Sequence, residues 1–358
     1  MKHSDFVPLH LHTEYSLLDG AIKIAEVIEK ASEFRMPAVA ITDHGNLFGT
    51  VKFYKAATKA GLKPIIGCEV YVAPESRLKK QQSPDGENAF HLVLLARNHD
   101  GYRNLVTLVS RSYLEGFYYK PRIDHDLLEQ FSGGLIGLSS CLHGEIPYHL
   151  SRGNTDRARK AALRYKEILG PENFFLELQD NGLKAQYEVN RKLCDLSREL
   201  HIGLVATNDC HYLTKEDSRA HDILLCIQTG KTINTKERMR FETDQLFFKS
   251  PEEMKRAFSE IPEAILNTRE IAERCNLDFQ LGRTMLPRFD IEDGTPPEDY
   301  LQRLAAEGLR EKFGAATPPG AYLERLSYEI DVIKNMGFAS YFLIVWDFIN
   351  YEIGRAHV

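Results

Sequence analysis

The 358-residue sequence lacks several features that would assign it at once to a common class of protein. It has no apolar run long enough to cross a bilayer, and its first ten residues, MKHSDFVPLH, are too mixed for a signal peptide. We therefore expect a cytoplasmic protein without a membrane partner. The sequence also contains neither G-x-G-x-x-G nor a P-loop, the common glycine-rich motifs that cradle phosphates.

Cysteine is scarce and scattered. Six cysteines occur in the chain, and no two of them form a C-x-x-C pair. We therefore expect reduced thiols, of which one or two could bind a metal. The net charge of −6 disfavours a general basic binder of nucleic acid. It does not exclude DNA as a substrate, because divalent cations can supply the positive charge that a phosphodiester needs.

The sequence does contain a regular alternation of strand and helix patterns. Strands are expected at 6–11, 38–42, 65–72, 91–96, 135–139, 174–178 and 204–207, and the main helices at 21–34, 47–60, 97–115, 156–169 and 184–200. Near-continuous apolar strands between helices indicate an α/β protein with a parallel sheet that helices cover. About seven such strands fit a closed barrel better than an open sheet.

Residue types that bind metals gather near the ends of these strands. His10 and His12 have the i, i+2 spacing that points two imidazoles to one face of a strand, and Asp209 and His211 repeat this spacing. Barrel enzymes build their active sites at the C-terminal ends of the strands. The candidate donors are His10, His12, Asp19, His44, Glu69, His91, Cys141, Asp209 and His211. Nine donors suit two or three divalent ions rather than one tetrahedral ion.

Each donor also has a simpler explanation when it is taken alone. His91 opens its strand instead of ending it, Cys141 could be a small buried hydrophobe, and Asp19 before a glycine could be a turn residue. Their coincidence at strand ends favours the metal site. The other histidines are expected to be structural or solvated: His3, His99, His125, His143, His149, His201 and His221. The basic stretches 79–80 and 231–240 are expected to be solvated, with contact to a phosphate backbone as the alternative.

The donors and their neighbours resemble the polymerase and histidinol phosphatase (PHP) domain family. The matching segments are His10–His12, Asp19-Gly20, Thr42–Asn46, Gly67–Val70, His91–Ala96, Cys141-Leu142 and Asn208–Tyr212. Three further segments narrow the resemblance to the N-terminal part of the bacterial replicative DNA polymerase III alpha subunits. These are Phe53-Tyr54, Gly101–Leu105 and Met336–Val345.

The resemblance implies a domain organisation. Residues 1–285 would form the PHP domain, a distorted (β/α)7 barrel. Residues 286–351 would begin the polymerase palm as a mostly helical lead-in. Residues 352–358 depart from the family pattern and are expected to be a non-native tail.

The resemblance also implies three metal positions. His10, His12, Glu69 and Asp209 would hold one ion, and Glu69 would bridge to a second ion that His91 and Cys141 complete. A third set consists of Asp19, His44 and His211. Because this sequence keeps all nine donors, we expect zinc or manganese to bind, with Asp43 orienting a ligand without touching the metal.

The activity that the resemblance implies is metal-dependent 3′→5′ exonuclease cleavage at the 3′ end of a DNA primer. DNA-directed DNA polymerase activity would belong to the full-length protein. The implied partners are DNA and the other subunits of the polymerase III holoenzyme. Two alternatives stay open, a non-catalytic scaffold that docks a separate proofreading subunit and a free-standing phosphoesterase.

Overall fold

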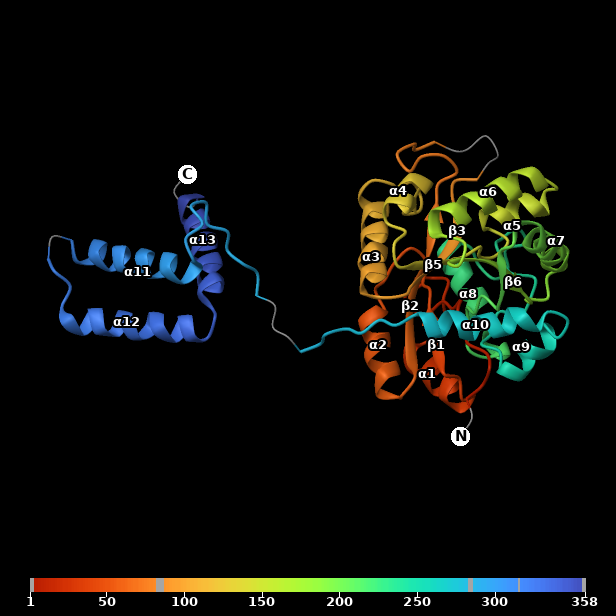
Figure 1. The fold of residues 1–358 in the computed structure, drawn as a ribbon, viewed down its shortest axis with the longest axis horizontal. Coiled ribbons are helices and arrows are strands. Elements are labelled where there is room, and N and C mark those ends of the chain that lie inside the picture. Colours follow the sequence, from red (N-terminus) through yellow and green to blue (C-terminus); the bar gives the residue numbers. More distant parts are fainter. Residues whose placement is uncertain (1–2, 82–86, 283–285, 315, 356–358) are drawn as a thin grey trace. The chain divides into compact units, whose positions relative to one another are not determined.

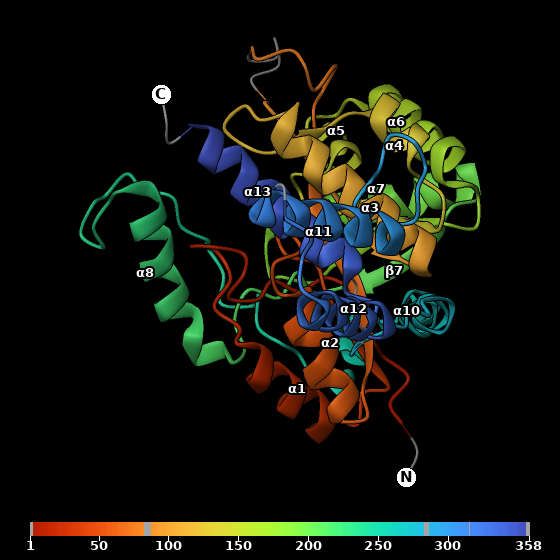
Figure 2. The same cartoon turned by 90° about the vertical axis from the view of Figure 1, so that its left-hand side faces the viewer.

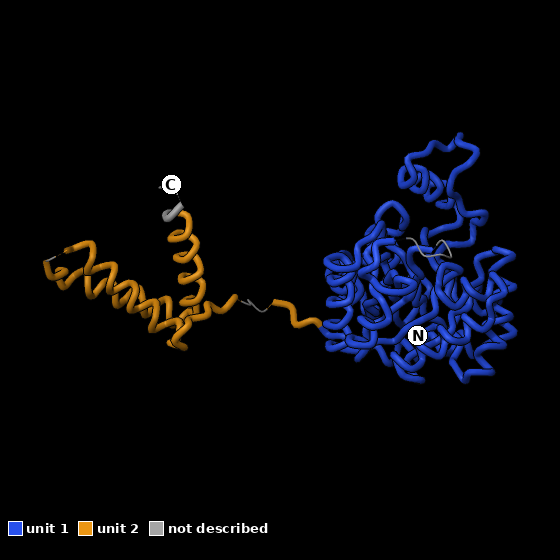
Figure 3. The backbone as a smooth tube through the Cα atoms, turned by 90° about the horizontal axis from the view of Figure 1, so that it is seen from above, with its two compact units in different colours: residues 1–278 blue, residues 279–358 orange. Residues whose placement is uncertain are grey.

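The structure is a computed structural model that describes residues 3–81, 87–282, 286–314 and 316–355. It divides into two compact units, residues 1–278 and residues 279–358 (Figure 3). The domain boundary expected at 285/286 stays a prediction, because residues 283–285 lie outside the described residues. Residues 356–358 of the expected non-native tail also lie outside them.

The first unit is built on one seven-stranded sheet, which confirms the expected α/β fold class. The sheet order is β1-β2-β3-β5-β6-β7, and the short strand β4 pairs with β2. The strands are β1 Ala38–Ile41, β2 Lys63–Val72, β3 Phe90–Ala96, β4 Arg122–Ile123, β5 Leu135–Leu138, β6 Phe174–Gln179 and β7 Gly203–Thr207.

The expectation of a fully parallel sheet is wrong at β3. This strand runs antiparallel to both of its neighbours, β2 and β5, whereas the other pairs in the sheet are parallel. Two antiparallel strands need no crossover helix, and the described residues between β2 and β3 contain none. The reversal brings the beginning of β3 to the edge where the parallel strands end.

The expected strand at 6–11 is also wrong. This segment is extended but makes only isolated bridges, in part because Pro8 has no amide hydrogen to donate. It nevertheless lies between the two edge strands. Pro8 O accepts from Ala40 N at 3.0 Å, and Cys210 O, just beyond β7, accepts from His12 N at 2.8 Å. The N-terminal segment thus connects the β1 and β7 edges and closes the barrel.

Helices surround the strands of this unit (Figures 1 and 2). Helix α1 is typical, since it buries Ile24, Val27, Ile28 and Ala31 along one face and leaves its charged residues outside. The helices are α1 Ile24–Glu33, α2 Thr50–Lys59, α3 His99–Leu114, α4 His125–Gln130, α5 Glu145–Ser151, α6 Thr155–Leu169, α7 Lys184–Leu200, the 3-10 helix η1 Lys215–Asp217, α8 Ser218–Thr229, α9 Pro251–Ala257 and α10 Pro262–Arg274.

Strand alternation divides the barrel interior into an apolar layer and a polar layer. On β2, Ile65 belongs to the buried apolar cluster, and Glu69 follows four residues later on the same face. On β7, Val205 belongs to that cluster, and Asp209 continues its period just past the strand end. The polar layer therefore lies at the C-terminal ends of the parallel strands, which is where barrel enzymes place their chemistry.

The described residues of the second unit form three helices, which agrees with the mostly helical segment expected there. They are α11 Pro297–Phe313, α12 Gly320–Asn335 and α13 Ala339–Arg355. Lys334 of α12 donates to Gln302 of α11 at 2.7 Å. No single described helix is long and apolar enough to cross a membrane, and only the pair α12 and α13, bent by 114°, meets the length and composition test together.

Candidate metal centre

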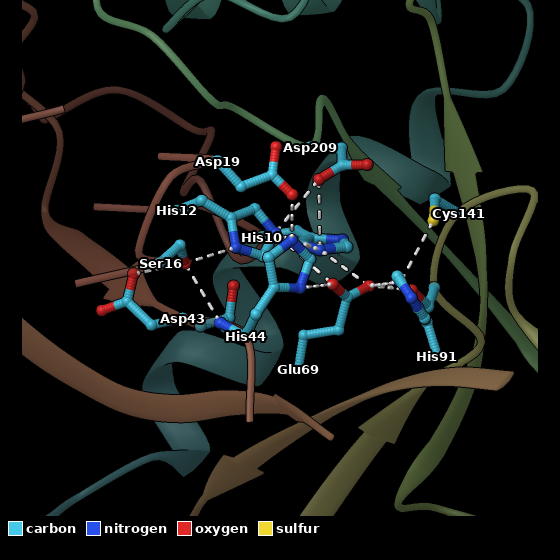
Figure 4. Close-up of polar contacts among 12 residues, drawn as sticks. His10, His12, Ser16, Asp19, Asp43, His44, Glu69, His91, Cys141 and Asp209 are labelled. Carbon is cyan, nitrogen blue, oxygen red and sulfur yellow. Dashed lines mark hydrogen bonds and ion pairs between the residues drawn. The ribbon is translucent and has the colours of Figure 1, made fainter. Parts of the chain in front are cut away.

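All nine candidate donors converge at the polar end of the barrel, and Figure 4 labels all of them except His211. Glu69 occupies the middle of the group. Its Oε1 lies 3.3 Å from His10 Nε2 and 3.1 Å from His91 Nδ1, and its Oε2 lies 2.7 Å from His44 Nδ1. One carboxylate thus faces three histidines from three different segments of the chain, as a ligand that bridges two ions would.

Four of the donors surround one point. His10 Nε2 lies 3.1 Å from His12 Nε2, and Asp209 Oδ1 lies 3.3 Å from each of these nitrogens. Glu69 contributes the fourth donor, at 3.3 Å from His10 and 3.6 Å from His12. Ligands about 3.3 Å apart are expected around a tetrahedral ion with bonds of about 2.0–2.1 Å. The spacing therefore fits a zinc-sized ion.

The remaining donors lie on either side of this group. Cys141 Sγ is 3.7 Å from His91 Nδ1. On the other side, Asp19 Oδ2 is 3.1 Å from His44 Nε2, and Asp19 Oδ1 is 3.8 Å from His211 Nε2. The antiparallel direction of β3 explains why His91, at the start of its strand, reaches the same edge as residues that follow strand ends.

Three buried polar atoms in the centre lack a hydrogen-bond partner among the described residues. They are His44 Nδ1, Glu69 Oε2 and Asp209 Oδ1. His44 Nδ1 and Glu69 Oε2 form an ion pair at 2.7 Å but no hydrogen bond. A buried polar group without a partner costs about 1–3 kcal/mol. A bound cation would satisfy these atoms, so the residues present fit the metal ions that the resemblance implies.

The tautomers of two histidines are fixed by neighbours outside the donor set. His10 Nδ1 donates to Glu177 Oε1 at 2.7 Å, which leaves Nε2 facing Asp209. His12 Nδ1 lies 3.0 Å from Ser16 Oγ, and Ser16 in turn donates to Asp43 Oδ1 at 2.8 Å. Because the serine hydroxyl donates its hydrogen to Asp43, Nδ1 of His12 is the donor in the bond to Ser16. Nε2 of His12 is then free to bind metal.

Among the described residues, the carboxylate of Asp43 forms no hydrogen bond or ion pair with any of the nine donors. It accepts from Thr13 N at 2.7 Å, from Thr13 Oγ1 and from Ser16. Burial raises the pKa of this carboxyl, and the hydrogen bonds from Thr13 and Ser16 oppose that rise. The expectation that Asp43 orients a ligand stays a prediction.

The surroundings shift the pKa values of the ionisable groups in the centre in opposite directions. Burial lowers the pKa of His12 to about 3, and His44 and His211 contribute in the same direction. Burial also acts to lower the pKa of His44, but the carboxylates of Glu69 and Asp19 outweigh it and raise the pKa to about 10. Burial opposes ionisation of Glu69, yet His91, His10 and His44 hold its pKa well below the ordinary value.

Two residues at the centre, Glu177 and His221, were missed by the sequence patterns. Glu177 is fully buried on β6, and its signal was a glutamate within the otherwise apolar run of that strand. His221 on α8 was expected to be structural or solvated. It is buried, and its Nε2 lies 3.4 Å from Asp19 Oδ1. No local pattern could place it there, because 202 residues separate the two.

Two family models match the chain. The PHP domain model matches residues 8–181. A second model, described as the bacterial DNA polymerase III alpha NTPase domain, matches residues 299–355. The first match contains seven of the nine candidate donors, and the second falls within the three-helix unit.

Curated relatives match almost the whole chain. DNA polymerase III subunit alpha of Treponema pallidum is 44% identical over 352 residues, which are 98% of this chain and 30% of the relative. The same subunit of Borreliella burgdorferi is 47% identical over 352 residues, 97% of this chain and 30% of the relative. The chain thus spans about 30% of the length of these relatives.

Solved structures resemble the chain only weakly. A two-domain protein from Bacteroides vulgatus, described as containing a predicted PHP-like metal-dependent phosphoesterase, has a TM-score of 0.38 and 13% identity. The match covers 75% of this chain and 66% of that protein. The sequence matches assign the family: the chain belongs to the bacterial DNA polymerase III alpha family and corresponds to the N-terminal part of these longer proteins.

Proposed function

We propose that the barrel is a metal-dependent phosphodiesterase that acts as a 3′→5′ exonuclease on the 3′ end of a DNA primer. The observation that carries the proposal is the complete set of nine donors around Glu69, four of them at the spacing of a tetrahedral ion. Two or three divalent ions, zinc or manganese, would bind to this set.

When bound, such ions lower the pKa of a water molecule and neutralise charge that develops on a phosphoryl group. The side chains around them have separate tasks. Glu177 holds His10, and the pair of Ser16 and Asp43 holds His12, so that both Nε2 atoms keep their direction. Holding the donors in place reduces the rearrangement that the reaction requires.

A pocket of about 410 Å³ adjoins the donors and gives a substrate access to them. Asp19, His44, His91 and Cys141 form its inner wall, while Leu142 and Phe241 contribute to its apolar lining. This volume is within the range of about 300–1,000 Å³ that is typical of small-molecule pockets. A nucleotide at the end of a DNA strand is a suitable occupant of this pocket.

We propose that the longer protein carries out DNA-directed DNA synthesis in the cytoplasm with other polymerase III subunits. This extends to the chain what the names of its relatives say of them. The scaffold alternative is less favoured because all nine donors are present. The free-standing phosphoesterase is less favoured because residues 299–355 match a polymerase III alpha model.

The exonuclease proposal can be tested with the purified chain, Mn²⁺ or Zn²⁺ and a primer that ends in a 3′ mismatch. Wild type should shorten the primer, and His12→Ala should be at least about 100-fold slower, since ligands and their supports matter on this scale. His99→Ala, at the exposed start of α3, is the matched control and should keep full activity. Equal rates for wild type and His12→Ala would contradict the proposal.

A further inference from the structure

Two pockets meet beside the candidate metal centre. The larger pocket, of about 410 Å³, is the one whose inner wall is formed by Asp19, His44, His91 and Cys141. The smaller, of about 150 Å³, is lined on its outer side by Leu17, Phe48 and Tyr113. Both pockets share five lining residues: Asp19, His44, Tyr71, Lys120 and Gln228. The shared wall means that a ligand at the centre could extend into either pocket.

Lys120 is the only lysine or arginine that lines either pocket in the part of the chain that the structure describes. Its side chain is exposed, and its Nζ lies 5.1 Å from the centroid of the Tyr71 ring. No described carboxylate forms an ion pair with it. The ammonium group is thus positioned beside the centre with its charge available to a ligand.

The backbone holds Lys120 in this place. Tyr119 has a φ of 58°, and Tyr118 N donates to Lys120 O at 3.1 Å, so the chain makes a tight turn here. The turn lies against the segment that carries His44. A Cβ atom added to Gly45, whose φ is 61°, would come within 2.9 Å of Pro121 Cγ. The lysine turn and the His44 turn are therefore packed together.

Exposed aromatic rings continue outward from the smaller pocket. Phe48 is 63% exposed and Tyr113 is 42% exposed, and both line that pocket. Stacking of a base on an aromatic ring contributes about 1–3 kcal/mol and does not depend on base identity. Rings beside a lysine are typical of proteins that bind single-stranded nucleic acid. A small phosphomonoester would use none of these outer rings.

We propose that the centre binds a single DNA strand that runs through both pockets, with Lys120 contacting one backbone phosphate next to the bond at the metal centre. The terminal nucleotide occupies the larger pocket, and the preceding base packs against Phe48 and Tyr113. DNA as the ligand rests on the proposed function. The path of the DNA strand through the two pockets and the contact of Lys120 with a backbone phosphate go beyond that function.

Binding can be measured separately from cleavage. The probe is a fluorescent oligothymidylate whose last linkage is a phosphorothioate, titrated with the full chain in Mn²⁺ at several salt concentrations. Each phosphate contact to a single strand contributes about −0.7 to the slope of log K against log salt. Lys120→Gln should therefore weaken binding and make this slope less steep by about 0.7. Lys120→Arg should restore the slope, and the exposed Lys160→Gln on α6 should leave it unchanged.

A slope and an affinity in Lys120→Gln equal to those of wild type would overturn the proposal, even if wild type cleaves the mismatched primer. The proposal would be supported if wild type binds the probe and Lys120→Gln binds it more weakly, with the expected change in slope. This holds even if no cleavage occurs.

Discussion

Glu177 Oε1 lies 2.7 Å from Nδ1 of His10, and both side chains are fully buried. The same carboxylate accepts from Ser140 N at 3.0 Å and from Gln179 Nε2 at 2.9 Å. Its role is therefore to fix the direction of His10, not to bind an ion itself. Carboxylates of this kind commonly support histidines that ligate metals.

Glu177→Gln should weaken metal binding by about 10–100-fold, since an amide supports a ligating histidine less well than a carboxylate does. The amide would also bring a second NH₂ group toward Gln179. Competition with a chelator, followed by metal analysis of the protein, measures the change. Glu172→Gln, at an exposed position before β6, is the control. Unchanged affinity in Glu177→Gln would show that His10 needs no such support.

Ser16→Ala tests the second supporting chain. The serine hydroxyl accepts from His12 Nδ1 at 3.0 Å and donates to Asp43 at 2.8 Å. Removing the hydroxyl takes away the hydrogen bond that orients His12. It also takes away a donor to one oxygen of the buried Asp43. We expect metal affinity to fall about tenfold and the free energy of unfolding to fall by about 1–3 kcal/mol. The same chelator competition and a urea titration measure the two effects, and a loss of stability with unchanged metal affinity would contradict the orienting role.

The sequence was sufficient to predict which nine side chains gather at this end of the barrel, because the spacing of His10 and His12 and the positions of His44 and Asp209 after apolar runs are local signals. The positions of most strands were also predictable from their apolar runs. The direction of β3 was not, since nothing within residues 90–96 indicates which way the strand runs. His91 therefore looked misplaced until the antiparallel pairing brought it to the same edge as Glu69.

The supporting residues were harder to find because their partners are distant in sequence. Glu177 contacts His10 across 167 positions. The closure of the barrel by residues 8–12 depends on bonds to Ala40 and Cys210, which no local pattern encodes. What periodicity cannot predict is thus the pairing between segments rather than the chemistry of single residues.

Removal of metal should lower the stability of the barrel. Ions that bind only the folded state stabilise it by about 2.7 kcal/mol when their concentration is 100 times Kd. Without them, Glu69 Oε2 and Asp209 Oδ1 stay buried without hydrogen-bond partners among the described residues. A melting curve with EDTA should therefore lie below the curve with Mn²⁺ or Zn²⁺, and His12→Ala should show a smaller difference. Identical curves for wild type would mean that the centre binds no ion tightly.

Glu145 provides a test of pH dependence that is separate from the metal centre. It joins three helices, because Tyr165 donates to Glu145 Oε2 at 2.8 Å and His125 Nε2 lies 3.2 Å from the same oxygen. Burial acts to raise the pKa of Glu145, but His125 and Tyr165 outweigh it and lower the pKa below its ordinary value of 4.5. The stability from this carboxylate is thus present above that value and is lost as the pH falls through the lower, folded-state pKa.

Glu145→Gln should reduce the free energy of unfolding by about 1.5–3 kcal/mol at pH 7, the range for a hydrogen bond to a charged group. The difference in free energy of unfolding from wild type should stay constant at pH values above the ordinary glutamate pKa. It should shrink at pH values below it. Urea titrations of the metal-free proteins at a series of pH values measure this difference. Glu167→Gln, exposed on α6, is the control. A difference that stays constant as the pH falls well below the ordinary glutamate pKa would mean that the charge of Glu145 does not contribute to stability.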